Sequence, residues 1–430
     1  MTILVLMILS ILVPLVIGLP IALALGGSGL FWLVSLNPNL LKGASYALWN
    51  TAANYMLISV PLFILMGEIM QRTSLGSRFY AATSRWVGWL PGGLLHSNIL
   101  ACGIFSAVSG SSVATAATIG TNAVPELTRL GYPRGQVFGS LAAGGTLGIL
   151  IPPSIPLIIY AALTEVSLGK LFLGAFLPGV MMLVAFSLYI FLDAVIRPKK
   201  YVKTRERNAE YSLLKSLVDV GPIFVIIVLI LAGIYSGYAT PTEVAAVGVI
   251  AALIIAAARS ELTFKIFGDA LISTVRFTSM IMFVVIGAQI FAFALFAWGI
   301  PREVSGMIAE ISSNPTVVLA VIVVMYLVLG MFIDPISIMV LTLAVLFPVI
   351  TSLGFDPVWF GVVLVLLLEI GLLTPPVGIN LYVVLGIAPP GTRLSEVVYG
   401  TLPYIGVLLL GVLAMIIFPE IVLWLPNSMN

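Results

Sequence analysis

The run GGTLGILIPPS at residues 144–154 returns in altered form as GLLTPPVGIN at residues 371–380. Each run places glycine and a proline pair inside a long apolar stretch, where a helix would otherwise continue. Gly148 corresponds to Gly371, and the pair at 152–153 to the pair at 375–376, at an offset of 223 residues. The repeated spacing of helix breakers predicts two structural repeats, each with one interrupted helix.

The same offset recurs outside these two runs. Pro125 matches Pro348 and Gly131 matches Gly354 at 223, while Pro20 matches Pro241 and Glu68 matches Gln289 at 221. We therefore divide the chain into a first repeat at 1–215 and a second at 216–430. Each holds five spans and one hairpin, and an odd number of spans inverts the second copy. Inverted repeats with interrupted helices are typical of secondary transporters.

Composition limits the class of protein. Of 430 residues 61% are hydrophobic and 8% charged, against roughly 25% charged in ordinary soluble domains, which predicts an all-α polytopic protein of the lipid bilayer. The net charge of +2 offers no basic field for nucleic acid. One cysteine and one histidine exclude a disulfide framework, a Cys/His zinc site and an HExxH metalloprotease.

Apolar runs of spanning length predict about ten spans and two re-entrant hairpins. The hairpins are placed at 93–127 and 316–352, and the segment 76–90 is an amphipathic arm lying in the membrane interface. The turn at Gly18 to Pro20 separates the first two runs; without it the chain has nine spans. The spans fall near 3–18, 20–37, 48–71, 137–162, 171–196, 219–237, 240–258, 271–297, 358–386 and 401–425.

The positive-inside rule orients these spans. Of the 19 Lys and Arg residues, all but Lys42, Lys170 and Arg302 fall on one side, which we assign to the cytoplasm. The C-terminus is then periplasmic. The nine-span alternative moves only the N-terminus.

The broken segments are the candidate sites. Unwound backbone inside a bilayer is tolerated where it lines a cavity or is buried in protein. Half-helix C-termini offer carbonyls to a cation and N-termini offer N–H groups to an anion, so neutral oxygens here favour Na⁺ over a divalent ion, and intramembrane acids for a proton relay are scarce. We expect substrate contacts from Ser111, Ser112, Thr115, Thr146, Ser154, Asp334 and Asn380.

Several of these residues have a structural alternative. Small residues such as Ser109 to Ser112 also serve helix packing. Asp334 beside Pro335 also fits a helix N-cap. Glu68 is expected to pair with Arg72 one turn later, and Glu369 either orients the second break or faces a partner.

At Ser106 to Thr118, Gly144 to Pro156 and Gly371 to Asn380 the sequence resembles the large membrane subunit of the tripartite ATP-independent periplasmic (TRAP) transporters, over essentially the whole chain. The resemblance implies an elevator-type ion-transporter fold and Na⁺-driven uptake of an organic acid. It implies two partners, a small four-helix membrane subunit on a separate chain and a periplasmic substrate-binding protein. It places Na⁺ near Ser106, Ser109 and Gly148, to which we add Pro152, and near Gly330, Gly371, Thr374 and Val377.

The alternatives are a stand-alone Na⁺-coupled anion symporter, an ion channel and an intramembrane protease. For a protease, the segment 107–110 (AVSG) lacks the leading glycine of a G-x-S-G motif and the single histidine lies thirteen residues before Ser109, so we predict no enzymatic activity. We expect the bacterial inner membrane as the location.

Overall fold

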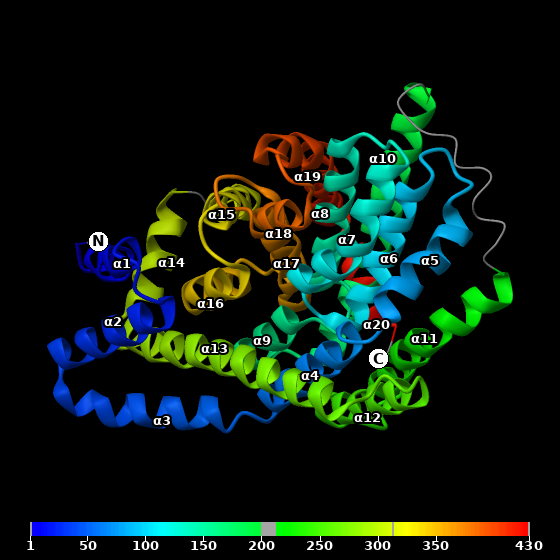
Figure 1. Ribbon diagram of the computed structural model, residues 1–430. Helices are drawn as coiled ribbons and strands as arrows, with labels where there is room; N and C mark the ends of the chain where they lie inside the picture. Colours follow the sequence, from blue (N-terminus) through cyan, green and yellow to red (C-terminus); the bar gives the residue numbers. More distant parts are fainter. Residues whose placement is uncertain (1, 199–211, 312–313, 429–430) are drawn as a thin grey trace.

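The computed structural model describes residues 2–198, 212–311 and 314–428, and these form helices joined by turns, with no strand among them (Figure 1). The predicted cytoplasmic Lys199, Lys200, Lys203, Arg205 and Arg207 lie outside the described residues. The all-helical class is confirmed.

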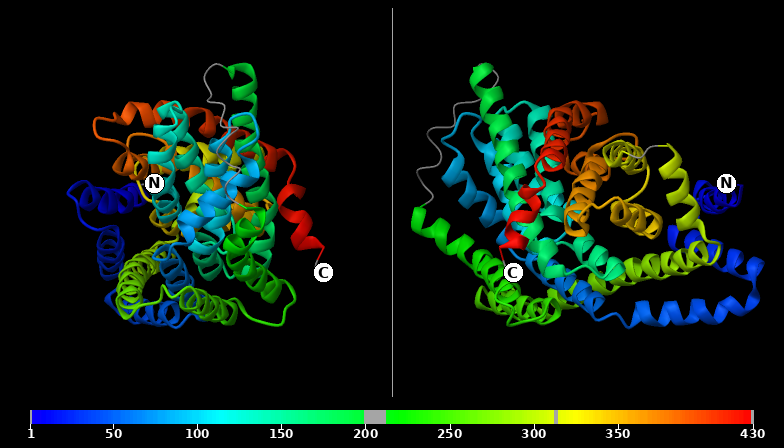
Figure 2. Two further views of the ribbon diagram at one scale, coloured as in Figure 1. Left: turned by 45° about the vertical axis from the view of Figure 1, so that its right-hand side comes forward. Right: turned by 180° about the vertical axis from the view of Figure 1, so that it is seen from behind.

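A peripheral layer of long helices runs along one side of the molecule and around one end (Figures 1 and 2). Its members α2 and α13, α4 and α12, and α3 and α13 pack against one another. The layer consists of α1 (Thr2–Val16), α2 (Ile21–Leu36), α3 (Leu41–Ala52), α4 (Ser59–Gln71), α11 (Leu213–Tyr235), α12 (Pro241–Ala258) and α13 (Phe264–Ala297), with short 3₁₀ turns at Pro38–Leu40 and Tyr55–Ile58.

The remaining helices form a central bundle and two arms. The bundle contains α6 (Leu94–Ser109), α7 (Ser112–Arg129), α8 (Arg134–Leu150), α9 (Ile155–Thr164), α10 (Leu168–Ile196), α15 (Pro315–Gly330), α16 (Pro335–Ser352), α17 (Pro357–Leu373), α18 (Ile379–Ile387), α19 (Leu394–Ile417) and α20 (Glu420–Asn427). The arms are α5 (Leu75–Val87) and α14 (Ile300–Ile311).

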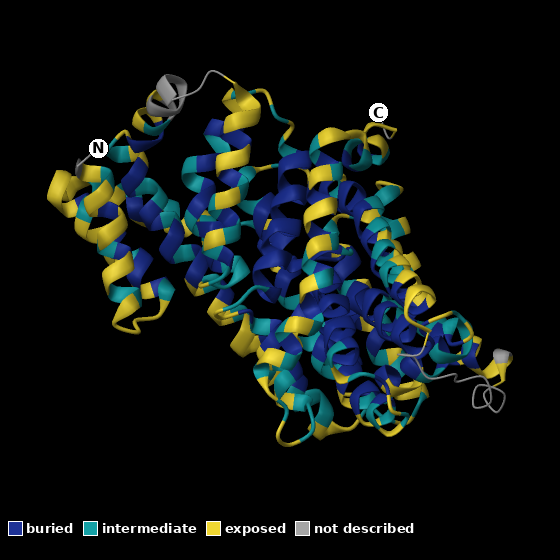
Figure 3. Ribbon diagram, turned by 90° about the horizontal axis from the view of Figure 1, so that it is seen from above, coloured by how far each residue is buried: buried dark blue, intermediate teal, exposed yellow. Residues whose placement is uncertain are grey.

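Two helices, α8 and α17, form the centre of the bundle. Every residue from 136 to 150 in α8 and from 358 to 373 in α17 is buried, and buried residues concentrate in the same region (Figure 3). A helix that is apolar on all sides is stable only when other helices surround it. The two helices that carry the sequence breaks are therefore the core of the protein.

Each predicted hairpin is a pair of helices joined by a short break. In the first, α6 and α7 are separated by Gly110 and Ser111; in the second, α15 and α16 are separated by residues 331–334. The two broken helices are α8–α9, interrupted at 151–154, and α17–α18, interrupted at 374–378. Both proline pairs contain a cis peptide bond, at Pro152–Pro153 and Pro375–Pro376.

Three predicted segments differ from the structure. The span at 48–71 is not continuous, because α3 and the helical segment from Tyr55 to Gln71 meet at an angle of 46°. The span at 401–425 ends at Ile417, and α20 follows after Pro419, which cannot continue the hydrogen-bond ladder. Residues 298–315, which lie between the predicted span at 271–297 and the predicted hairpin at 316–352 and were assigned to neither, contain the amphipathic helix α14.

The number of spans is less clear-cut than the sequence predicts. Within the described ranges, seven helices are long and apolar enough to cross a membrane, or eight if the bent pair at 38–71 is one span. The first two apolar runs form separate helices, with Gly18 at a φ of 91° in the turn between them, but each is shorter than a full span. The predicted ten spans remain a prediction.

Candidate transport site

The tip of the first hairpin lies against the first broken helix. Gly110 ends α6 in the left-handed region at a φ of 59°, and Ser111 caps α7. A Cβ added to Gly148 of α8 would lie 2.8 Å from the backbone of Ser111, so this position accepts only glycine. Ser109 is hydrogen-bonded to Thr115 at 2.6 Å, which holds the hydroxyls of the tip together.

The tip of the second hairpin meets the second broken helix in the same way. A Cβ on Gly371 would lie 2.7 Å from the Cα of Gly330. The Val377 N–H donates to the Met331 carbonyl at 3.1 Å and joins the break to the tip. Thr374 is partly buried and donates its hydroxyl to the Ile370 carbonyl at 2.6 Å. In each half the structure therefore brings a hairpin tip and a break together.

Charged groups are few at both places: the second tip contains Asp334, which caps α16, and Glu369 lies fully buried two residues before Gly371. The described residues contain no group of three or more His, Cys, Asp and Glu that could hold a metal ion. Ser106 is fully buried and donates to the Gly103 carbonyl at 2.6 Å, and Pro152 lies in the cis pair of the first break. A monovalent cation at either break would therefore be held by hydroxyls and by carbonyls at helix C-termini, which carry partial negative charge.

A cavity of about 400 Å³, here called the cargo cavity, lies between the two hairpin tips and the peripheral layer. The first turn of α7, residues 111–114, faces it with the N-terminal end of a helix, which attracts anions. Asp334 also lines it and accepts a hydrogen bond from the Ser337 N–H at 3.0 Å as N-cap of α16. The cavity thus combines hydroxyls, the N-terminal turn of α7 with its Ser111 cap, and one capping carboxylate.

The predicted substrate residues divide into two groups. Ser111, Ser112 and Asp334 line the cargo cavity. The others do not line it and are fully buried in the bundle, where Thr115 bonds Ser109, Thr146 donates to the Ala143 carbonyl, Ser154 donates to the Ile149 carbonyl and Asn380 donates to the Ala142 carbonyl.

The opposite wall of the cargo cavity was not predicted. It comes from the peripheral layer, through Ile64, Glu68 and Gln71 of α4 and Phe277, Met280 and Ile281 of α13. The expected pair of Glu68 and Arg72 is present at 3.0 Å, and Glu68 lines the cavity as well. In the sequence, the match of Glu68 with Gln289 at the offset of 221 was the one signal that pointed to a residue of this wall.

A second, more open cavity of about 350 Å³ adjoins the first and shares Gln71 and Ala117 with it. Its lining is uncharged and mostly polar, with Thr73 and Ser77 facing Thr118, Thr121 and Asn122 of α7. It leads to the side on which the sequence places the basic residues. The two cavities are therefore adjacent, and the second is the more open one.

The arm α5 is tied to the peripheral layer near this route. Arg78 contacts Asp219 at 3.3 Å and Glu261 at 3.8 Å, and Trp86 donates to the Ser216 hydroxyl at 2.9 Å. Burial alone would raise the pKa of Glu261, but hydrogen bonds from Ser74 and the nearby Arg78 and Arg259 outweigh it and lower the pKa. The arm is thus tied to the peripheral layer by charged and polar contacts, and it also packs against α6 and α7 of the bundle.

These features define a multi-pass membrane transport protein, since broken helices that meet hairpin tips are the construction of secondary transporters. Residues 8–421 match the family described as tripartite ATP-independent periplasmic transporter, DctM component, and the chain belongs to this family. It is a TRAP transporter large membrane subunit of the bacterial inner membrane.

Relatives agree with this assignment. The chain is 35% identical to the C4-dicarboxylate TRAP transporter large permease protein DctM of Pseudomonas aeruginosa, covering 94% of each chain. It is 32% identical to the sialic acid TRAP transporter large permease protein SiaM of Vibrio cholerae, covering 95% of each. Among solved structures, the YdaH transporter of Alcanivorax borkumensis has a TM-score of 0.67 at 16% identity, covering 91% of this chain and 90% of that one, a likeness of fold.

Proposed function

We propose that this subunit couples the entry of Na⁺ to the import of an organic acid delivered by a periplasmic binding protein. The observation that carries the proposal is the meeting of each hairpin tip with its broken helix, at Gly148 and at Gly371. These contacts gather carbonyls and hydroxyls without a carboxylate cage, a ligand set that suits a monovalent hard cation. The first Na⁺ is assigned to Ser106, Ser109, Gly148 and Pro152, and the second to Gly330, Gly371, Thr374 and Val377.

The cargo is assigned to the cargo cavity, with its carboxylate at the N-terminal turn of α7. Ser111 and Ser112 supply hydroxyls there, and the helix N-terminus favours a negative group. The apolar wall of Phe277 and Met280 leaves little for a large polar ligand to bind on that side. Relatives named for C4-dicarboxylate and for sialic acid support an organic acid as the cargo class.

The central bundle is assigned to the moving part of an elevator and the peripheral layer to its fixed scaffold. The cargo cavity lies at the boundary between them, which is where a sliding motion would carry it from one side to the other. The open polar cavity beside it supports an inward-facing state. Exposed apolar side chains on α1, α11 and α12, among them Val16, Val228 and Ile254, leave the scaffold a surface for lipid and for a small four-helix membrane subunit.

The test is uptake into proteoliposomes that contain this chain, its small subunit and its binding protein. The expected result is accumulation driven by a Na⁺ gradient, none with choline, and none when either partner is omitted. Equal uptake driven by a proton gradient alone would contradict Na⁺ coupling. Saturable Na⁺-driven uptake by this chain alone would identify it as a stand-alone anion symporter instead.

A further inference from the structure

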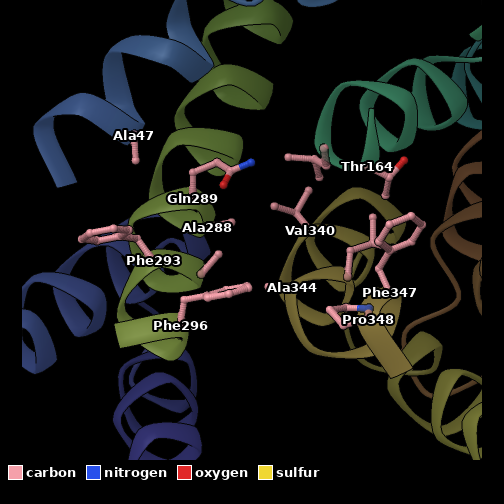
Figure 4. Close-up of a pocket in the computed structure, with 13 residues that line it drawn as sticks. Ala47, Thr164, Ala288, Gln289, Phe293, Phe296, Val340, Ala344, Phe347 and Pro348 are labelled. Carbon is pink, nitrogen blue, oxygen red and sulfur yellow. The ribbon is translucent and has the colours of Figure 1, made fainter. Parts of the chain in front are cut away.

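A third cavity lies on the opposite half of the same boundary between bundle and peripheral layer. It measures about 310 Å³ and separates α13 from α9 and α16; Figure 4 shows Gln289, Phe293 and Phe296 of α13 across from Thr164, Val340 and Phe347. We call it the outer cavity. Gln289 and Thr164 supply the polar side chains of an otherwise apolar lining.

The outer cavity and the cargo cavity use matching positions of the two predicted repeats. At the offset of 221 that pairs Glu68 with Gln289, Gln71 corresponds to Ala292. Glu68 and Gln71 line the cargo cavity, and Gln289 and Ala292 line the outer cavity. The peripheral layer therefore presents equivalent positions of the two predicted repeats to two different cavities.

The two walls differ in charge. On the inner wall, Glu68 lines the cavity and pairs with Arg72, which does not line it and instead donates to the Ser273 hydroxyl at 2.7 Å. The negative end of the pair thus faces the cargo. The corresponding positions of the outer wall hold the amide of Gln289 and the ring of Phe293, and neither carries a charge.

We propose that the outer cavity is the external opening of the cargo pathway. The negative charge of Glu68 then favours release of an organic anion at the inner wall, and the neutral amide of Gln289 allows the anion to bind at the outer wall. The inference rests on the proposed function, since it requires the bundle to carry the cargo past both walls. With the hairpins at the inner wall, the carboxylate of the cargo approaches Glu68 and is repelled. With the hairpins at the outer wall, it meets a neutral amide.

The expected size of the effect follows from Coulomb's law. Two like charges roughly 10 Å apart in a medium of effective dielectric about 20 change an equilibrium constant by on the order of tenfold. In the wild type Arg72, 3.0 Å from Glu68, offsets part of this repulsion, so the affinity for cargo should be weaker on the cytoplasmic side than on the periplasmic side by less than this factor. Removing the charge from one wall should change the affinity on that side only.

The first experiment follows the opening of the two walls without measuring uptake. Gln71→Cys and Ala292→Cys are made separately in this subunit, whose one native thiol, Cys102, is buried, and labelling is read on this subunit within the assembled transporter. Each is treated with a membrane-impermeant maleimide, from the cytoplasmic side for position 71 and the periplasmic side for position 292, in Na⁺ and in choline. The proposal expects reciprocal reactivity, one rising as the other falls.

Any other pattern overturns it. Parallel changes, or a change at position 71 alone, would mean that the outer cavity does not alternate with the cargo cavity. Reaction of Ala292→Cys only with a lipid-soluble maleimide would mean that the outer cavity holds lipid chains. Because this readout requires no cargo, it remains decisive even if Na⁺-driven uptake fails and the proposed function is rejected.

The second experiment tests the charges by side-specific exchange of labelled succinate or N-acetylneuraminate, whichever the wild type accumulates. Glu68→Gln should lower the half-saturating concentration on the cytoplasmic side about tenfold and leave the periplasmic value unchanged. Gln289→Glu should raise the periplasmic value by a similar factor. Glu68→Asp keeps the charge and should shift the cytoplasmic value less than Glu68→Gln does, while Glu303→Gln on α14, outside both cavities, should behave as wild type. Equal shifts on both sides, or none, would refute a role for these two residues in direction.

Discussion

Replacing Gly400 by alanine should destabilise the protein through one contact between α8 and α19. A Cβ on Gly400 would lie 2.0 Å from the Gly135 carbonyl oxygen, and a Cβ on Gly139 would lie 2.0 Å from the Gly400 carbonyl oxygen. Non-bonded heavy atoms rest at about 3.5–4.0 Å, so the two helices would have to separate by about 1.5 Å. Backbone atoms cannot rotate away as a flexible side chain can.

Gly406→Ala is the matched control, because it lies on the same helix and a Cβ there meets nothing within 4 Å. Overpacking costs about 1–3 kcal/mol, whereas alanine in a helix gains up to about 1 kcal/mol over glycine. Thermal unfolding of the purified subunit in detergent should therefore give Gly400→Ala a lower midpoint and Gly406→Ala an equal or higher one. Equal midpoints for the two variants would show that the predicted overlap is relieved without cost.

Three further changes test the candidate site. Thr374→Val removes one proposed Na⁺ ligand and should raise the Na⁺ concentration for half-maximal uptake, by a factor of about five for a contribution near 1 kcal/mol; an unchanged Na⁺ titration would remove Thr374 from the site. Asp334→Ala should lower the free energy of unfolding by about 1 kcal/mol, because α16 loses its N-cap, and Asp334→Asn should retain most of the cap's contribution. Gly371→Ala should abolish uptake by pushing the second hairpin off its break, while Gly386→Ala, which has open space, should transport normally.

The breaks could be located from the sequence because helix breakers act locally. The proline pairs at 152–153 and 375–376 mark the breaks, whereas single prolines such as Pro125 and Pro348 lie inside the continuous helices α7 and α16. The constant offset of the two pairs needs no tertiary information. The arm at 76–90 could be predicted for a similar reason, because apolar and polar residues alternate with the spacing of a helix within the segment itself. Helix α14 has the same signal in Ile300, Val304, Met307 and Ile311, and the glycine and proline at its start obscured it.

The walls of the cavities could not be predicted in the same way. Helices α8 and α17 are apolar on every side, so periodicity cannot indicate which side chains face a ligand and which face other helices. Thr146 and Asn380 were assigned to the substrate because they are polar residues near breaks, yet the structure encloses both and bonds them to backbone carbonyls. Phe277 and Met280 resemble any lipid-facing or packed residue until α4 and α13 are brought beside the hairpins.

The packing at the two breaks limits where motion can occur. Gly148 against Ser111 and Gly371 against Gly330 leave no room for a single methyl group, and from this close packing we expect each hairpin tip to move with its broken helix. Opening such a contact would remove the ligands of a cation bound there. The free energy of cation binding is therefore expected to shift the equilibrium between positions of the whole bundle. The boundary with α4 and α13 contains two separate cavities, although Gly67 of α4 also packs closely on the backbone of Ser109. The movement that carries cargo across the membrane is therefore expected along this boundary. The two proposed Na⁺ sites, which consist of bundle residues, would move with the bundle.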